Sequence, residues 1–162
     1  MAESCWDYPR PPRLEPARRR VRVLAPDGAV LADVPADPSA PRAWRVLETS
    51  HPPTYYVAGD AVAAGRLRPA AGTSWCEWKG QASYVDLLDA GGRVVRERAA
   101  WTYPHPTPGF EPLAGAFAFY PSGVRCLLDD EEVLAQEGDF YGGWISSEVT
   151  GPFKGAPGTL GW

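Results

Sequence analysis

Residues 73–84, TSWCEWKGQASY, bring several side chains that could do chemistry into one short stretch. If the stretch is extended, Trp75, Glu77 and Lys79 share one face, because successive side chains of a strand alternate. A buried glutamate–lysine pair could act as a general acid or base. On the surface the same pair would contribute only about 0–1 kcal/mol. We expect the stretch to line a pocket, with its chemistry left open.

Cys76 and Trp78 would lie on the opposite face of that strand. A cysteine nucleophile needs a nearby base, and the two histidines of the sequence are His51 and His105. Neither spacing indicates a catalytic dyad, so a small buried thiol is the competing interpretation. Whether the protein is an enzyme is left open; the catalytic candidates are Glu48, Lys79 and Cys76.

A second polar cluster runs from Glu48 to His51 and leads through Pro52-Pro53 into Tyr55-Tyr56. A carboxylate, two hydroxyls and an imidazole at this place could form the rim of a ligand site. The alternative is an ordinary turn with a solvated histidine. Two histidines without an HExxH spacing do not indicate a zinc site, so no metal and no cofactor are expected.

The sequence contains seven tryptophans and seven tyrosines. Large rings often form the core of a small β domain, so packing alone is one interpretation. The rings outnumber what such a core usually needs, and we expect some of them to face a cavity. The residues predicted to bind a ligand are Glu48, His51, Tyr55, Tyr56, Trp75, Trp78, Lys79, Trp101 and Tyr103.

These side chains must be positioned by short elements, since the chain has 17 glycines and 18 prolines. Turn signals separate strand-like segments every 8–12 residues, which predicts a mainly β domain. One short helix is expected at 61–67, capped by Asp60 and ended by Pro69. Tyr55–Val57 is expected as an edge strand or a strand start, because two prolines precede it. Hairpins are predicted over 20–34, 82–103 and 115–128, with a further strand at 44–48.

Charge is unevenly distributed along the chain. Residues 1–22 carry six arginines and three acidic residues, whereas residues 129–139 carry six acidic residues and no basic one. The net charge of −4 disfavours nucleic-acid binding by the arginine-rich segment. We expect a solvated arm that contacts the acidic segment of its own chain or of a neighbour, which leaves a homo-oligomer open.

The expected location is the cytoplasm. No run approaches the roughly 20 apolar residues of a membrane span, and the first residues lack the apolar region of a secretory signal. The sequence has three cysteines, an odd number, and none of them forms a CxxC pair; they are Cys5, Cys76 and Cys126. This pattern argues against a disulfide framework and against a cysteine-only zinc site.

Four segments resemble a bacterial family known as domain of unknown function 427. They are ETSHPPTYY (48–56), TSWCEWKGQASY (73–84), AAWTYPHPTPGFEPLAGAFAFYP (99–121) and FYGGWISSEVTGPFKG (140–155). The resemblance implies antiparallel sheets in a Mss4-like β-tent that lean together over a cleft, with long wrapping termini. It places a core at 20–128, between an extended arm (1–19) and a C-terminal hairpin and tail (129–162) of the same domain.

The family also carries a nucleotidyltransferase-like label, but the resemblance supplies no established activity. Such chemistry would need paired acidic residues for Mg²⁺ after a glycine turn, and after Gly142-Gly143 the sequence offers Glu148 alone. The predicted function is therefore metal-free binding of a small polar or planar ligand in an aromatic-lined cleft. The alternatives are an enzyme that uses Glu48 and Lys79, and a structural or interaction protein that uses the charged ends.

Overall fold

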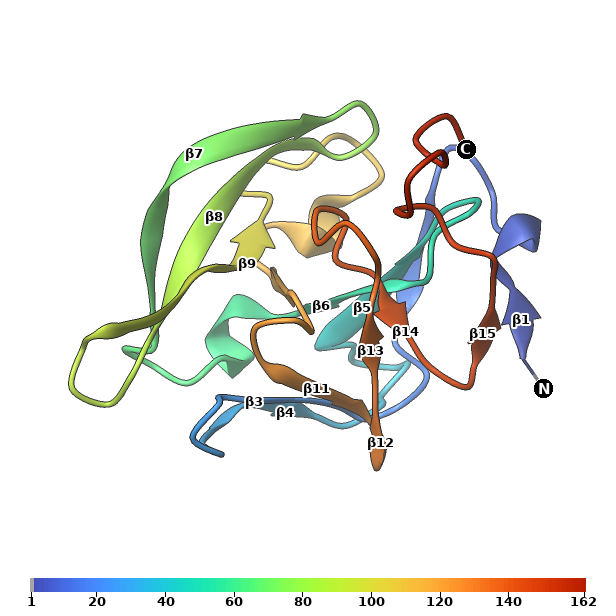
Figure 1. The fold of residues 1–162 in the computed structure, drawn as a ribbon. Coiled ribbons are helices and arrows are strands. Elements are labelled where there is room, and N and C mark those ends of the chain that lie inside the picture. Colours follow the sequence, from blue (N-terminus) through green and yellow to red (C-terminus); the bar gives the residue numbers. More distant parts are fainter. Residues whose placement is uncertain (1) are drawn as a thin grey trace.

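The computed structural model describes residues 2–162 and shows a mainly β protein, as predicted (Figure 1). Helical structure in this range is limited to three turns of three residues, η1 (Cys5–Asp7), η2 (Gly59–Ala61) and η3 (Glu111–Leu113). The strands are β1 (Glu3–Ser4), β2 (Arg13–Pro16), β3 (Val21–Leu24), β4 (Val30–Val34), β5 (Ala43–Leu47), β6 (Thr54–Val57), β7 (Leu67–Cys76), β8 (Gly80–Leu88), β9 (Val94–Thr102), β10 (Phe117–Phe119), β11 (Arg125–Leu128), β12 (Glu131–Glu132), β13 (Leu134–Ala135), β14 (Trp144–Ile145) and β15 (Val149–Thr150).

Two antiparallel sheets form the body of the molecule. The larger has seven strands in the order β2-β5-β6-β10-β9-β8-β7, and the smaller has four in the order β12-β11-β3-β4. Two short pairs complete the pattern: β13 lies antiparallel to β14, and β1 lies parallel to β15. The β1–β15 pair brings the first and last parts of the chain side by side (Figure 1).

The larger sheet buries a different cluster on each face. One face packs on the smaller sheet through aliphatic side chains together with Tyr55 and Phe119. The other face carries mostly rings, among them Tyr56, Tyr84 and Trp101. Neighbouring residues of a strand point to opposite faces, so the Tyr55-Tyr56 pair supplies one ring to each cluster. The ring-bearing face is the one that holds the candidate site.

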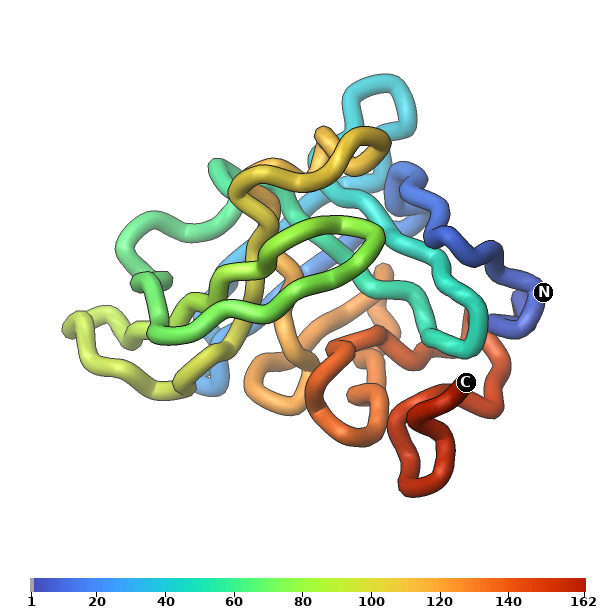
Figure 2. The backbone as a smooth tube through the Cα atoms, turned by 90° about the horizontal axis from the view of Figure 1, so that it is seen from above, coloured from blue at the N-terminus to red at the C-terminus, as the bar shows by residue number. Residues whose placement is uncertain are grey.

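The long strands β7 and β8 pair as a hairpin whose tip reaches toward the C-terminal segment (Figure 1). The register shifts between Pro69 and Thr73, as expected where a proline cannot donate to the ladder. Seen from above, the hairpin crosses over the sheet as a long loop (Figure 2). Residues 73–84 therefore form the tip of this hairpin: the end of β7, a turn and the start of β8.

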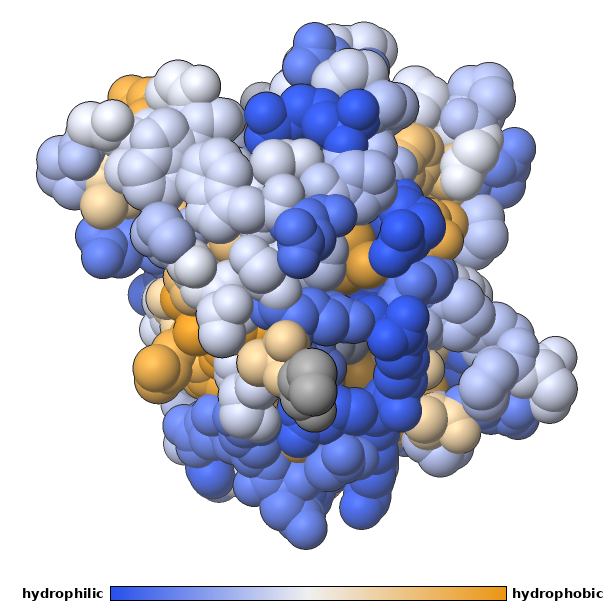
Figure 3. All heavy atoms as spheres, turned by 90° about the vertical axis from the view of Figure 1, so that its right-hand side faces the viewer, coloured by the Kyte–Doolittle hydropathy of each residue, from blue (hydrophilic) through white to orange (hydrophobic). Residues whose placement is uncertain are grey.

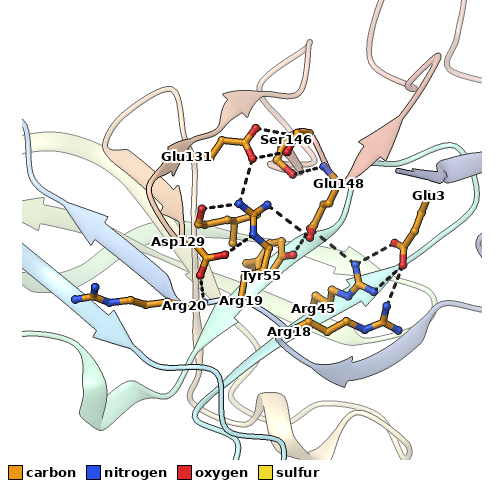
Figure 4. Close-up of polar contacts among 12 residues, drawn as sticks. Glu3, Arg18, Arg19, Arg20, Arg45, Tyr55, Asp129, Glu131, Ser146 and Glu148 are labelled. Atoms are coloured by element: carbon orange, nitrogen blue, oxygen red, sulfur yellow. Dashed lines mark hydrogen bonds and ion pairs between the residues drawn. The ribbon is translucent and has the colours of Figure 1, made fainter. Parts of the chain in front are cut away.

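A cluster of charged side chains ties both ends of the chain to the sheet (Figure 4). Arg45 of β5 is 1% exposed, and its guanidinium contacts Glu3 at 3.1 Å and Glu15 at 2.6 Å. Glu148 lies 3.8 Å from the same guanidinium and accepts a hydrogen bond from the hydroxyl of Tyr55. Burial raises the pKa of Tyr55, which keeps the hydroxyl a donor.

The arginine-rich segment contacts the acidic segment of its own chain. Arg19 pairs with Asp129 at 3.0 Å and with Glu131 at 3.2 Å, and Arg22 pairs with Asp130 at 2.9 Å. The face that carries both chain ends is mostly hydrophilic (Figure 3). None of the helical segments within residues 2–162 is long and apolar enough to cross a membrane.

Two local predictions are wrong, and a third is narrowed to one of its alternatives. The helix at 61–67 does not form: the stretch contains Gly65 at φ +76°, and Leu67 pairs with Leu87 as the start of β7. Of the two alternatives for Tyr55–Val57, the strand start is confirmed: β6 begins at Thr54, directly after the two prolines, and lies between β5 and β10 instead of at an edge. Residues 115–128 do not pair with each other, since β10 joins the larger sheet and β11 the smaller one.

Candidate functional site

A pocket opens on the ring-bearing face of the larger sheet, with a cavity volume of about 410 Å³. This is within the range of small-molecule sites, which is roughly 300–1,000 Å³. The pocket lies between the β7–β8 hairpin tip, the sheet and the C-terminal segment. It is lined by Glu48, His51, Thr54, Tyr56, Ser74, Trp75, Cys76, Glu77, Trp78, Lys79, Ala82, Tyr84, Trp101, Tyr103, Tyr120, Phe140, Tyr141 and Lys154.

Eight of the nine predicted ligand residues line this pocket. The exception is Tyr55, which lies on the opposite face of β6, fully buried against Trp144 at a ring-centroid distance of 4.9 Å. Alternation along the strand puts Tyr56 in the pocket and Tyr55 in the core between the sheets. Tyr55 is therefore left out of the candidate site.

The turn of the hairpin is fixed by the loop that follows β9. The backbone N–H of Thr107 donates to the carbonyl of Lys79 at 3.0 Å, and the Thr107 hydroxyl donates to the carbonyl of Trp78. Gly80 adopts φ +108°, a conformation that favours glycine, and begins β8. These contacts place Trp78 and Lys79 against the pocket, while Glu77 stays exposed at its edge.

Lys79 is the most unusual polar residue of the site. Its side chain is 9% exposed, and within residues 2–162 no hydrogen bond or ion pair engages its ammonium group. Its Nζ lies 5.7 Å from the ring centroid of Tyr103, within the range of a cation–π contact. Burial opposes the ammonium form, but interactions with Tyr56, Cys76 and Glu48 outweigh it and raise the pKa of Lys79. The pocket therefore contains a cation without a partner.

His51 is held as a neutral imidazole with a defined tautomer. The N–H of Gly143 donates to Gln136 Oε1 at 3.0 Å, which directs Gln136 Nε2 toward the carbonyl of Lys154 at 2.7 Å and toward His51 Nδ1 at 3.3 Å. Nδ1 must therefore accept, and the ring proton sits on Nε2. Burial, together with the positive charges of Lys154, Lys79 and Arg10, lowers the pKa of His51 to about 3.

Glu48 has two partners, the guanidinium of Arg10 and the neutral imidazole of His51. Its carboxylate lies 3.4 Å from Arg10 Nε and 3.7 Å from His51 Nε2. Glu48 and Lys79 line the same pocket but form no ion pair at 4.0 Å or less. The structure thus gives Glu48 a partner in the N-terminal segment and leaves Lys79 without one.

The rings of the site form one connected wall. Trp101 Nε1 donates to the hydroxyl of Tyr56 at 3.2 Å, and the ring of Trp101 lies 4.7 Å from that of Tyr120. Tyr120 donates to the carbonyl of Phe140 at 2.9 Å. Burial raises the pKa of Tyr103, so this phenol stays protonated. The wall is rigid, apolar and ordered from behind by hydrogen bonds.

Gly142-Gly143 supports this wall from the C-terminal side. A Cβ atom at Gly142 would lie 2.4 Å from Cη2 of Trp101, and one at Gly143 would lie 2.5 Å from Cγ of Pro52. Gly142 also adopts φ +70°. Gly142 allows the backbone to approach Trp101 closely, and Gly143 allows it to approach Pro52. Both glycines therefore have a packing role.

Exposed rings border the mouth of the pocket. Trp75 at the hairpin tip is 71% exposed and Phe140 of the C-terminal segment is 57% exposed. Tyr141 packs edge-on against His51 at 4.8 Å, and Lys154 Nζ lies 5.2 Å from the Tyr141 ring centroid. Large exposed rings beside a cavity are typical of binding sites. Here they extend the apolar wall toward solvent.

Sequence reasoning missed eight lining residues, which are Thr54, Ser74, Ala82, Tyr84, Tyr120, Phe140, Tyr141 and Lys154. Tyr84 lies within residues 73–84. Because it is two residues from Ala82 on a strand, the two side chains share a face, and this alternation could have predicted its place. The residues from the C-terminal segment had no such signal. Their place depends on how the segment crosses the sheet, which no local pattern encodes.

The fold and the site together define a class: a mainly β domain whose larger sheet carries an aromatic pocket with a buried cation. Within that class, the chain belongs to the family described as a domain of unknown function (DUF427) and labelled NTP_transf_9, whose model matches residues 13–130. No curated protein matches the chain. Among residues 2–162 no group of three or more histidine, cysteine or acidic side chains is arranged to hold a metal ion.

Proposed function

We propose that this protein binds a small planar molecule in the pocket on the ring-bearing face of the larger sheet. The observation that carries the proposal is a preformed cavity of about 410 Å³ walled by Tyr56, Trp101, Tyr103 and Trp78. Concave sites with mostly apolar walls and a few convergent polar groups are the usual form of a ligand pocket. The Mss4-like arrangement and the cytoplasmic location belong to this proposal as predictions.

The ring wall favours a flat ligand over a branched aliphatic one. Aromatic side chains gain about 0.5–1.5 kcal/mol from offset or edge-on contacts with another ring, beyond the area they bury. The hydrogen bond from Trp101 to Tyr56 and the glycine backing at Gly142 hold the wall in place before a ligand arrives. A preordered wall lowers the entropic cost of binding.

The acid–base alternative receives less support from the same geometry. Glu48 faces Arg10 and His51, and the imidazole of His51 is buried and neutral with its proton on the nitrogen that faces Glu48. These contacts satisfy Glu48 without a substrate. They explain the polar cluster at residues 48–51 as a support for the pocket rim.

The test is a titration with planar compounds, monitored by tryptophan fluorescence and by calorimetry. The panel contains indole, adenine, adenosine and indole-3-acetate. Thr54 lines the pocket, and Thr54→Trp should fill part of the cavity and weaken binding at least tenfold. Val30→Trp is the matched control, because Val30 is an exposed residue of the smaller sheet. The proposal fails if no compound produces a signal, or if both variants weaken binding equally.

A further inference from the structure

The pocket contains a positive charge that has no close partner within residues 2–162. Lys79 is buried, lines the cavity, and has no hydrogen-bond or ion-pair partner within residues 2–162. Removing an ammonium group from water costs several kcal/mol unless a partner compensates for it. Longer-range interactions keep the ammonium form and raise the pKa of Lys79, but no partner lies at hydrogen-bond or ion-pair distance from it. An anion that enters the pocket can supply that partner.

The residues around Lys79 do not supply that anion. Glu48 is the nearest acidic side chain of the interior wall, and Arg10 at 3.4 Å already shares its charge. Glu77, the other acidic residue that lines the pocket, is exposed at the hairpin tip. Lys154 adds a second positive charge on the C-terminal side of the cavity. The cavity lining therefore carries two positive side chains, Lys79 and Lys154, and Lys79 has no ion-pair partner within residues 2–162.

The nearby neutral groups do not change this balance. The hydrogen bonds of Gln136 keep Nδ1 of His51 unprotonated, so the imidazole carries no charge near neutral pH. Burial raises the pKa of Tyr56 and Tyr103, so both phenols are uncharged. A ligand that meets Lys79 thus meets a largely buried ammonium group beside uncharged rings, where a charge-assisted hydrogen bond is strong.

We propose that the ligand is a planar molecule with an anionic oxygen group, a carboxylate or a phosphate, which pairs with Lys79 while its flat part lies against the ring wall. This inference rests on the proposed function and narrows it to one class of ligand. A lysine binds either group as a compact point charge, so the shared chemistry is an anionic oxygen. The mouth bordered by Trp75 and Phe140 leaves room for the rest of the ligand.

The experiment compares two matched pairs of probes by calorimetry. Indole-3-acetate and indole-3-acetamide differ in a carboxylate; adenosine 5′-monophosphate and adenosine differ in a phosphate. For the unmodified protein we expect the anionic member of at least one pair to bind ten times more tightly than its neutral partner. The pair that shows the preference identifies the kind of anionic group.

The variants locate the source of the preference. Lys79→Met should bring the ratio within a pair close to one, with the affinity for the neutral member changed less than threefold. If Lys79→Met folds poorly, Lys79→Gln is measured in its place, and the same loss of preference is expected. Thermal melting shows whether each variant is folded. Arg93→Met removes the same charge from an exposed turn and should leave the ratio at its original value.

The outcomes separate this inference from the proposed function. If both members of each pair bind equally well, the inference of an anionic group is refuted, but the proposal of a pocket for a planar ligand is retained. A preference that survives in both Lys79 variants also overturns this inference, because another residue then supplies the charge. Failure of all four probes to bind removes the pocket function, and this inference with it.

Discussion

Substituting Gly142 tests the packing on which the ring wall depends. In Gly142→Ala the new Cβ would lie 2.4 Å from Cη2 and 2.6 Å from Cζ3 of Trp101. The residue also adopts φ +70°, where a side chain costs about 1–2 kcal/mol. Overpacking of a rigid neighbourhood adds about 1–3 kcal/mol. We expect a total loss of about 2–5 kcal/mol in the free energy of unfolding.

Gly92→Ala is the matched control for the backbone part of this loss. Gly92 adopts φ +84°, but a Cβ there meets no atom within 4 Å. Both variants lose the same chain entropy in the unfolded state, an effect of about 0.4–1 kcal/mol that cancels in the comparison. The difference between them therefore reports the close contacts with Trp101 and Tyr120, about 1–3 kcal/mol.

Urea denaturation at constant m value measures both losses, and thermal melting checks them. A difference of 1–3 kcal/mol corresponds to roughly 2–12 °C between the melting temperatures of the two variants. Equal losses would refute the reasoning, because Trp101 would then have moved aside into the cavity at little cost. Its fluorescence would report such a movement directly.

Three further predictions concern charge and access. Arg45→Met should lower the free energy of unfolding by about 3 kcal/mol, since it leaves the partly buried carboxylates of Glu3 and Glu15 without their partner, whereas Arg20→Met at an exposed pair should lower it far less; urea denaturation measures both. His51 has a lowered pKa, so protons favour the unfolded state: stability should fall below pH 6.5 by up to about 1.4 kcal/mol per unit down to pH 3, and denaturation curves of His51→Asn should lack this component. In the folded protein a thiol reagent should label Cys76 first, because Cys5 and Cys126 are buried, and equal labelling rates would contradict the structure.

The parts of the fold that sequence could predict are those set by local chemistry. The turn Pro26-Asp27-Gly28 between alternating segments gives the β3–β4 hairpin, and the glycines after Ala90 give the β8–β9 hairpin. Residues 48–56 and 73–79 were also expected near one another in a ligand site. They line one pocket because β6 and the hairpin tip share the ring-bearing face.

The parts of the fold that the sequence did not predict depend on pairing between segments that are distant in the chain. A helix at 61–67 is too short to be stable alone, and the pairing of Leu67 with Leu87 decides its structure. The Gly115–Leu128 segment reads as a hairpin, yet Ala118 pairs with Trp101 while Cys126 pairs with Val23. Alternation can say that Tyr55 and Tyr56 face opposite ways, but not which face holds the cavity.

The pocket is completed by residues beyond the span shared with the family. The family model ends at residue 130, whereas Gln136 sets the tautomer of His51, and Tyr141 and Lys154 form one wall of the cavity. The segment that carries them is held by Glu148, which contacts Arg45 of the larger sheet at 3.8 Å. The buried charges thus have a role besides stability, because they fix the segment that closes the site. In a chain limited to residues 13–130, the ring-bearing face would stay open and His51 would lose the partner that keeps Nδ1 unprotonated.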